Sequence, residues 1–407
     1  APHLPGGKYA SPVSGVVRAG RRLYLSAQMA TDASGAMQGL GDPAAQADHV
    51  MRNIKALIEA AGGSLKHVGK LTTSIIDRAH RKAVYETIGR HLQGVYPVST
   101  GLVVNGLARP EALVQVDVEA MLSDSLNDDG TAHERIRRYG MPQWFGQQID
   151  WQGCMIVRAP DELFIRGQTG SMLDGSRTVG EGRRPEDAGA QADLALQNLA
   201  TLLKDAGASM SDVLKITVFV QDRAYREAVY PMIGKHFRGI HPVSTGIVMT
   251  AFARPELLFE IDAVAIPGRG KPHDRFRKYH SSAAKYGLSG QRLDCDFCMA
   301  VRAGKTVVLR GQTGVDLNEK MQGMGDARAQ ADQAMKNVRA LLADAGARME
   351  DVVKATLYVT DRAYLAPAAE AVLKHLDGVR PAFSQMVVKG LAGPELLMEV
   401  DITAVVP

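Results

Sequence analysis

Two glutamates in similar apolar segments are the residues best suited to acid–base chemistry. Glu260 of "FEIDAVA" stands two residues before Asp262, and Glu399 of "MEVDITA" stands two residues before Asp401. On a β-strand both acids of such a pair point to the same side. Neighbouring carboxylates shift one another's pKa and can act as a general base. A solvated strand edge or a structural partner for a basic residue is the alternative. In a third similar segment, "VQVDVEA", the glutamate is replaced by Gln115, which cannot act as a base.

Two arginines interrupt segments that otherwise consist of core residues. Arg166 lies in "ELFIRGQTG" and Arg310 lies in "TVVLRGQTG". A guanidinium on such a strand needs a partner or a cleft. It either binds an anionic or carbonyl group of a ligand, or forms a structural ion pair with Glu260 or Glu399 across the sheet.

Hydroxyl side chains follow a proline in three related segments, where they could line a pocket or hydrogen-bond at the start of a strand. They are Ser99, Thr100, Ser244, Thr245 and Ser384. A nucleophilic serine would need an activating base, and none can be assigned from the sequence.

The three cysteines, Cys154, Cys295 and Cys298, are too few for a four-ligand structural zinc site. Buried apolar cysteines are favoured over a reactive thiol at Cys298. The sequence has no phosphate loop, dinucleotide fingerprint or HExxH motif, so no cofactor and no metal is expected.

These residues belong to segments that occur three times. Pro97, Pro242 and Pro381 open the same segment in each copy. The predicted units span residues 1–123, 145–267 and 290–407. Each reads as ββαβαββ, an α+β arrangement with helices packed on one face of a sheet. The linkers between the units are expected to be solvated, partly helical connectors that dock on the next unit.

Composition restricts the class of protein. The 407 residues are 45% hydrophobic and 23% charged, as in a soluble globular protein. A net charge of +4 with 5% aromatic residues argues against nucleic-acid binding. No segment is apolar for long enough to span a membrane, and no secretion signal is recognised. The few cysteines favour a reducing compartment. We therefore expect a cytoplasmic protein without membrane or nucleic-acid partners.

The ordered motifs "LYLSAQ", "AQAD", "DVLKIT", "PVST" and "ARPE" resemble those of the RidA (YjgF) family of reactive-intermediate deaminases. The resemblance covers all three units. It implies a trimer with a barrel-like core and ligand clefts between subunits. Here it implies a pseudo-trimer in one chain, either monomeric or paired as a homodimer, with a small-molecule ligand.

The chain departs from the pattern of active members of that family. Their arginine after the proline is replaced by Ser99, Ser244 and Phe383, so all three copies lack it. Their first-strand tyrosine is replaced by Val13, Gly153 and Phe297. Their serine before "GQ" or "AQ" is kept as Ser26 but becomes Arg166 and Arg310 in the other copies. We interpret this as an arginine-lacking branch in which the guanidinium has moved to another strand.

The resulting hypothesis is a RidA-type hydrolase that acts on a C–N bond of a small nitrogen compound, as in enamine or imine deamination. Glu260 or Glu399 activates water, and Arg166 or Arg310 stabilises the developing charge. Further substrate-binding residues are Gln168, Gln312, Phe297 and Cys298. The alternative is a non-catalytic small-molecule binding or scaffolding protein. A ribonuclease-like activity is disfavoured by the modest charge. Convergence of glutamate and arginine in one cleft would favour the enzyme.

Overall fold

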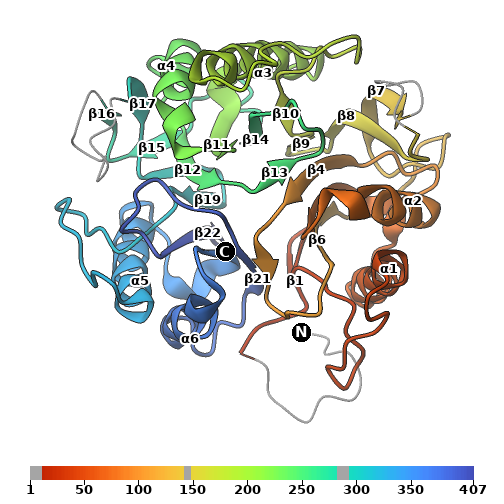
Figure 1. The fold of residues 1–407 in the computed structure, drawn as a ribbon, viewed down its shortest axis with the longest axis horizontal. Coiled ribbons are helices and arrows are strands. Elements are labelled where there is room, and N and C mark those ends of the chain that lie inside the picture. Colours follow the sequence, from red (N-terminus) through yellow and green to blue (C-terminus); the bar gives the residue numbers. More distant parts are fainter. Residues whose placement is uncertain (1–11, 142–147, 282–292) are drawn as a thin grey trace.

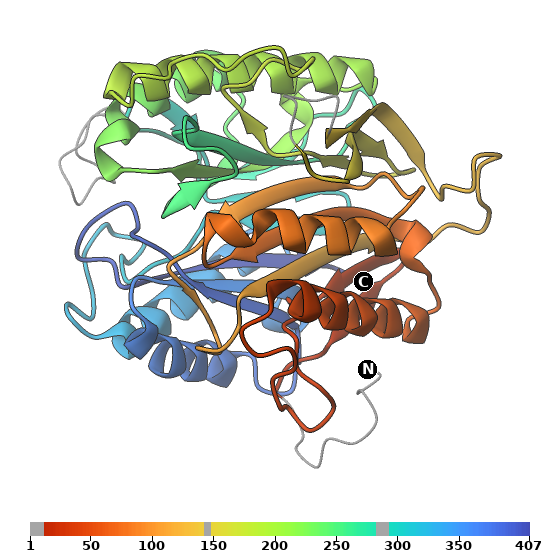
Figure 2. The same ribbon diagram turned by 45° about the vertical axis from the view of Figure 1, so that its right-hand side comes forward.

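The computed structural model describes residues 12–141, 148–281 and 293–407. Three α+β units lie around a common centre, with their strands toward the interior and their helices on the outside (Figure 1). The view turned by 45° shows the same separation of helices and strands (Figure 2). Among the described residues, no helix has both the length and the apolar character needed to cross a membrane.

The three units repeat one order of elements, which confirms the predicted fold class. The first contains β1 Val16–Ala19, β2 Arg22–Leu25, α1 Pro43–Ala60, β3 Val68–Ile75, α2 Arg81–His91, β4 Val98–Val103, β5 Gly106–Leu107 and β6 Val114–Met121. The second contains β7 Glu134–Gly140, β8 Gln152–Arg158, β9 Leu163–Ile165, β10 Gln168–Thr169, α3 Pro185–Asp205, β11 Val213–Val220, α4 Arg226–Phe237, β12 Val243–Val248, β13 Ala251–Phe252 and β14 Phe259–Ala265. The third contains β15 Asp274–Phe276, β16 Tyr279–Ser281, β17 Cys295–Phe297, β18 Ala300–Ala303, β19 Thr306–Leu309, α5 Ala327–Asp344, β20 Val352–Val359, α6 Leu365–His375, β21 Ala382–Val387 and β22 Met398–Val405.

Each unit is built on one long central strand: β3, β11 or β20. It pairs in parallel with the strand that follows the second helix and antiparallel with the last strand of the unit. The parallel connection requires a crossover, which α2, α4 and α6 provide. The first helix buries an apolar face; in α1, Val50, Ile54, Leu57 and Ile58 are at most 2% exposed. Asp42 caps this helix by accepting hydrogen bonds from Ala44 and Ala45.

The linkers differ from the prediction. Their described residues form strands and no α-helix, although they do dock on the next unit as expected. β7 pairs with β8, β15 pairs with β18, and β16 pairs with β17. An edge strand leaves a row of unpaired backbone groups, and the linker satisfies them. The predicted starts of the units at 1, 145 and 290 lie outside the described residues, but the second sheet already begins at Glu134 and the third at Asp274.

The units also pair with one another through backbone hydrogen bonds. β13 of the second unit pairs with β4 of the first, and β5 of the first pairs with β21 of the third. Val248 of the second unit bridges to Gly390 of the third. Each unit thus extends the sheet of a neighbour, and the pattern closes in a cycle. Each sheet in the described residues is open, so the expected barrel-like core is not established.

A cycle of buried ion pairs joins the same three interfaces. The cycle consists of Lys70–Asp262 (2.9 Å), Lys215–Asp401 (2.7 Å) and Lys354–Asp117 (2.6 Å). In each pair the lysine comes from the central strand of one unit and the aspartate from the last strand of another. Their side chains are at most 17% exposed. Loss of one partner of a buried pair typically costs about 3–5 kcal/mol, because the other charge stays buried. The cycle therefore fixes how the units meet.

Candidate active site

A cavity of about 30 Å³, here called the first cleft, lies between the first and second units. The first unit contributes Arg81 and Tyr85 of α2 and Ser99 of β4. The second unit contributes Arg166, which follows β9, and Glu260 of β14. The cleft therefore needs residues from both units.

An equivalent cavity of about 110 Å³, the second cleft, lies between the second and third units. Arg226, Tyr230 and Ser244 come from the second unit, and Arg310 and Glu399 come from the third. In both clefts the predicted glutamate and arginine line one cavity. This is the convergence that the enzyme hypothesis requires.

The glycine of each "RGQ" motif leaves room for the glutamate. A Cβ atom at Gly167 would lie 2.3 Å from Oε1 of Glu260, and one at Gly311 would lie 1.9 Å from Oε1 of Glu399. Both distances are shorter than van der Waals contact. Only glycine at these positions lets the carboxyl group lie across the neighbouring backbone.

Both glutamates are kept protonated by their surroundings. Burial, and next the charge of Asp262, raise the pKa of Glu260 to about 8, against the opposing effect of Arg166 and other cations. Burial, and next the charge of Asp401, raise the pKa of Glu399 to about 8 in the same way. Each cleft therefore holds a carboxylic acid near neutral pH that can donate a proton and later accept one.

The linker strands supply a tyrosine to each cleft, which the sequence analysis did not foresee. Arg166 donates from Nε to Oη of Tyr139 in β7 at 3.0 Å, and Tyr139 lies opposite Gly153 of β8. A Cβ atom at Gly153 would lie 3.0 Å from this hydroxyl. In the second cleft, Tyr279 lies with its ring centre 5.8 Å from the Arg310 guanidinium. The missing first-strand tyrosine is thus replaced from a neighbouring strand. The signal was a basic–aromatic phrase in both linkers, "RIRRYG" at 135–140 and "RFRKYH" at 275–280.

A second arginine in each cleft was also missed. Arg81 packs 5.0 Å from the ring centre of Tyr85. The guanidinium of Arg226 lies 4.4 Å from the ring centre of Tyr230, and its Nη1 donates to the Tyr230 hydroxyl at 3.0 Å. The detectable signal was an arginine four residues before a tyrosine at the start of the second helix in copies one and two.

The hydroxyl residues divide into two groups. Ser99 and Ser244 line the clefts. The other three donate hydrogen bonds to the aspartates of the ion-pair cycle: Thr100 to Asp262 (2.6 Å), Thr245 to Asp401, and Ser384 to Asp117 (2.5 Å). The structure thus places this second group in the contacts that join the units.

Of the remaining residues predicted to bind substrate, only some line a cleft. Phe297 and Gln312 line the second cleft. Gln168 and Gln312 each donate from Nε2 to the carbonyl oxygen of the arginine two residues earlier, at 2.7 Å. Cys298 is fully buried, its thiol lies 3.0 Å from the carbonyl oxygen of His241, and burial raises its pKa to about 12. The other two cysteines are also buried. Across the described segments, no cluster of three histidine, cysteine or carboxylate side chains could hold a metal.

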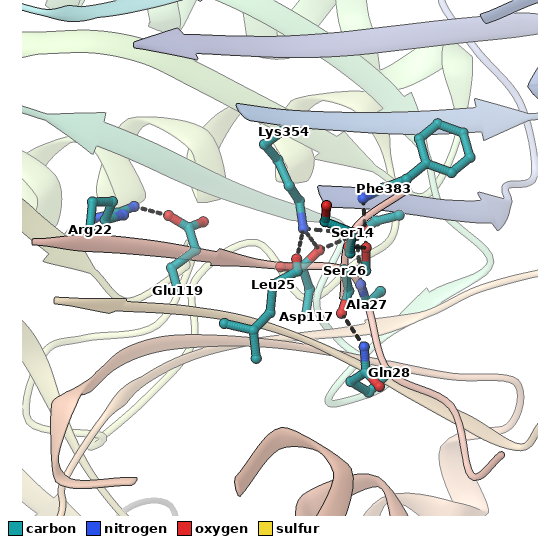
Figure 3. A network of polar contacts seen from close by, with 11 residues as sticks. Ser14, Arg22, Leu25, Ser26, Ala27, Gln28, Asp117, Glu119, Lys354 and Phe383 are labelled. Carbon is teal, nitrogen blue, oxygen red and sulfur yellow. Dashed lines mark hydrogen bonds and ion pairs between the residues drawn. The ribbon is translucent and has the colours of Figure 1, made fainter. Parts of the chain in front are cut away.

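The third interface, between the third and first units, has lost the arginines, the tyrosine and the glutamate of the clefts. The equivalent positions are Leu365, Ala369, Phe383, Ser26 and Gln115. The Phe383 side chain belongs to the buried core of the third unit. Its backbone N–H donates to Oγ of Ser26 at 2.8 Å, and Ser26 donates to the carbonyl oxygen of Ser14 at 2.6 Å. Figure 3 shows these contacts beside the Lys354–Asp117 pair, which is retained.

Comparison with known proteins agrees with the threefold repeat. Residues 7–122, 155–267 and 292–406 each match the family described as Endoribonuclease L-PSP. Protein DfrA of Myxococcus xanthus is 33% identical over 115 residues, which cover 28% of this chain and 86% of that protein. A 2-iminobutanoate/2-iminopropanoate deaminase of Dermatophagoides farinae is 36% identical over 63 residues, which cover 16% of this chain and 49% of the deaminase.

One solved structure is similar over almost the whole molecule. The crystal structure of a chorismatase aligns with 93% of this chain and 97% of its own, with a TM-score of 0.53 and 14% identity. At this identity the likeness shows a shared fold alone.

Proposed function

The chain belongs to the Endoribonuclease L-PSP family, and its motifs resemble those of RidA-like deaminases. We therefore propose that it hydrolyses the C=N bond of small 2-imino acids. The reaction takes place in the first and second clefts and releases ammonia and a 2-oxo acid. A relative named 2-iminobutanoate/2-iminopropanoate deaminase supports this class of substrate.

The observation that carries the proposal is the same in both clefts. A buried glutamate with a pKa of about 8 lines the cavity together with an equivalent pair of arginines, Arg81 and Arg166 in the first cleft and Arg226 and Arg310 in the second. An arginine pair suits a carboxylate, since a guanidinium binds it with two parallel hydrogen bonds. The protonated glutamate suits a basic imine nitrogen.

In the proposed mechanism, the carboxyl group of Glu260 or Glu399 donates its proton to the imine nitrogen. Water adds to the imine carbon, and the proton it loses returns to the carboxylate. The resulting carbinolamine transfers its hydroxyl proton to the amine through the same carboxyl group. The C–N bond then breaks, ammonia leaves and the carbonyl forms. The arginines bind the substrate carboxylate and stabilise the charge that develops nearby.

Ammonia release from imines generated in situ by an amino-acid oxidase tests this proposal. Semicarbazide traps the remaining imine and reports its lifetime. The wild-type protein should shorten that lifetime. Glu260→Gln and Glu399→Gln should each keep the activity of the other cleft, and the double variant should lose about 10²–10⁴-fold, the usual contribution of a general acid–base group.

The control is Glu227→Gln, an exposed substitution next to Arg226, which should leave the rate unchanged. Glutamine is a conservative replacement because the chain itself carries Gln115 at the equivalent position. A double variant with the full wild-type rate would refute the proposed role of the glutamates. A wild-type protein that does not shorten imine lifetime would refute the proposed reaction.

A further inference from the structure

The two clefts share their glutamate and arginines but differ in size. The first cleft has a volume of about 30 Å³. The second cleft, at about 110 Å³, is several times larger. One loop position differs between the two walls: Arg254 lines the first cleft, and the equivalent Gly393 lines the second.

Arg254 is held as part of the wall of the first cleft. Its Nη2 donates to Oγ of Ser171 at 2.6 Å and to Oγ1 of Thr178 at 2.5 Å. Its Nη1 lies 3.1 Å from Oε1 of Glu256. The side chain is only 16% exposed. These contacts direct the guanidinium to protein groups and hold a long side chain in the wall of the first cleft.

The second cleft lacks both this arginine and one of its anchors. Gly393 replaces the arginine, and Val315 occupies the position equivalent to Ser171. Yet the backbone could carry a side chain there. A Cβ atom at Gly393 would first meet the carboxyl end of Glu395 at 3.0 Å, which is the equivalent of Glu256. That flexible carboxylate could move aside and pair with an introduced arginine.

We infer that the residue at this position sets the size of the acid that each cleft accepts. The first cleft takes acids with a side chain no larger than a methyl group, and the second also takes branched, longer acids. The paired arginines present in both clefts bind the carboxylate, so charge selection is common to the two sites and size selection is not. The class of ligand rests on the proposed function, whereas the difference in size rests on Arg254 and Gly393.

Isothermal titration calorimetry with two stable 2-oxo acids tests this inference. Pyruvate is the small probe, and 4-methyl-2-oxopentanoate is the branched one. Wild-type protein should bind pyruvate at two sites and the branched acid at one. Arg254→Gly should bind the branched acid at two sites. Gly393→Arg should no longer bind the branched acid and should still bind pyruvate at two sites.

Arg109→Gly is the matched control, because Arg109 holds the equivalent position at the third interface, where its side chain is 43% exposed; it should change neither stoichiometry. Arg254→Ala removes the same side chain without the backbone freedom of glycine and should act as Arg254→Gly does. If Arg254→Gly and Gly393→Arg both bind the branched acid at the same number of sites as wild type, the inference is overturned. So would loss of a pyruvate site in Arg254→Gly, because Arg254 would then be a ligand-binding residue.

Failure of the proposed reaction gives a different result. A protein that shows the predicted change in stoichiometry but does not shorten imine lifetime would keep the size selection and exclude the hydrolysis. Absence of binding by both probes in every variant would overturn the size selection itself.

Discussion

At the scale of single residues, two acids on one strand have separate tasks. Glu260 lines a cleft and Asp262 holds Lys70 in an ion pair, although both lie on the same side of β14. The aspartate is one reason why the glutamate stays protonated, since its charge adds to the effect of burial on the pKa. The ion pair that joins two units therefore also tunes the acid beside it.

The raised pKa values predict how stability depends on pH. Glu260 and Glu399 have folded-state pKa values of about 8 against 4.5 for an ordinary glutamate. The folded state then binds more protons than the unfolded state between these values. Each group should lower the free energy of unfolding by up to about 1.4 kcal/mol per pH unit as the pH rises through this window.

Denaturant unfolding from pH 5 to pH 8 measures this effect. The Glu260→Gln/Glu399→Gln double variant should lose stability less steeply than wild type over that range, because glutamine does not titrate. Parallel curves for the two proteins would mean that these carboxyl groups ionise normally in the folded state.

Some site residues could be predicted from the sequence, and others could not. The glutamates and arginines stood out because each is polar in an apolar strand. Ser99 and Thr100 were predicted together, yet adjacent side chains of a strand point to opposite faces. Ser99 consequently faces the cleft and Thr100 faces Asp262. Alternation alone could not decide which hydroxyl faced the ligand, because that depends on the neighbouring unit.

At the scale of elements, the linkers were the main difference between expectation and structure. The order of elements in the three units, ββαβαββ repeated three times, followed from periodicity within each unit. The strand character of β7 did not, because its pairing partner β8 lies in the next predicted unit and the charged residues of β7 are not typical of a strand. Arg135 of β7 donates to the carbonyl oxygens of Val95 and Val68 in the first unit. The linker strand thus joins two units and brings Tyr139 to their cleft.

Tyr139→Phe tests the functional part of this linker. It removes the hydroxyl that accepts from Arg166, and a hydrogen bond to a charged group is worth about 1.5–3 kcal/mol. In a Glu399→Gln background, where only the first cleft works, kcat/KM should fall roughly tenfold or more, chiefly through a higher KM. The control is Tyr96→Phe. The ring of Tyr96 lies under the guanidinium of Arg138, which like Tyr139 belongs to β7, and this substitution should leave kcat/KM unchanged. Equal loss in both variants would indicate general disturbance of β7 and would contradict a positioning role for Tyr139.

At the scale of the whole molecule, the scaffold is symmetric and the chemistry is not. Ion pairs and backbone pairing join all three interfaces. The cleft residues are kept at only two interfaces, and the third has Phe383 and Gln115 in their place. A homotrimer would carry any substitution at all three interfaces. Fusion into one chain lets each interface change alone while the contacts that hold the units together are retained.

A crystal soaked with pyruvate is the most direct test of the central claim that two interfaces are ligand sites and the third is closed. The account predicts pyruvate in the first and second clefts, with its carboxylate beside Arg166 and Arg310. It predicts no pyruvate between Ser26 and Phe383. Pyruvate at that third interface would contradict it. So would pyruvate in the cavity of about 140 Å³ that the three lysine–aspartate pairs line, with both clefts empty.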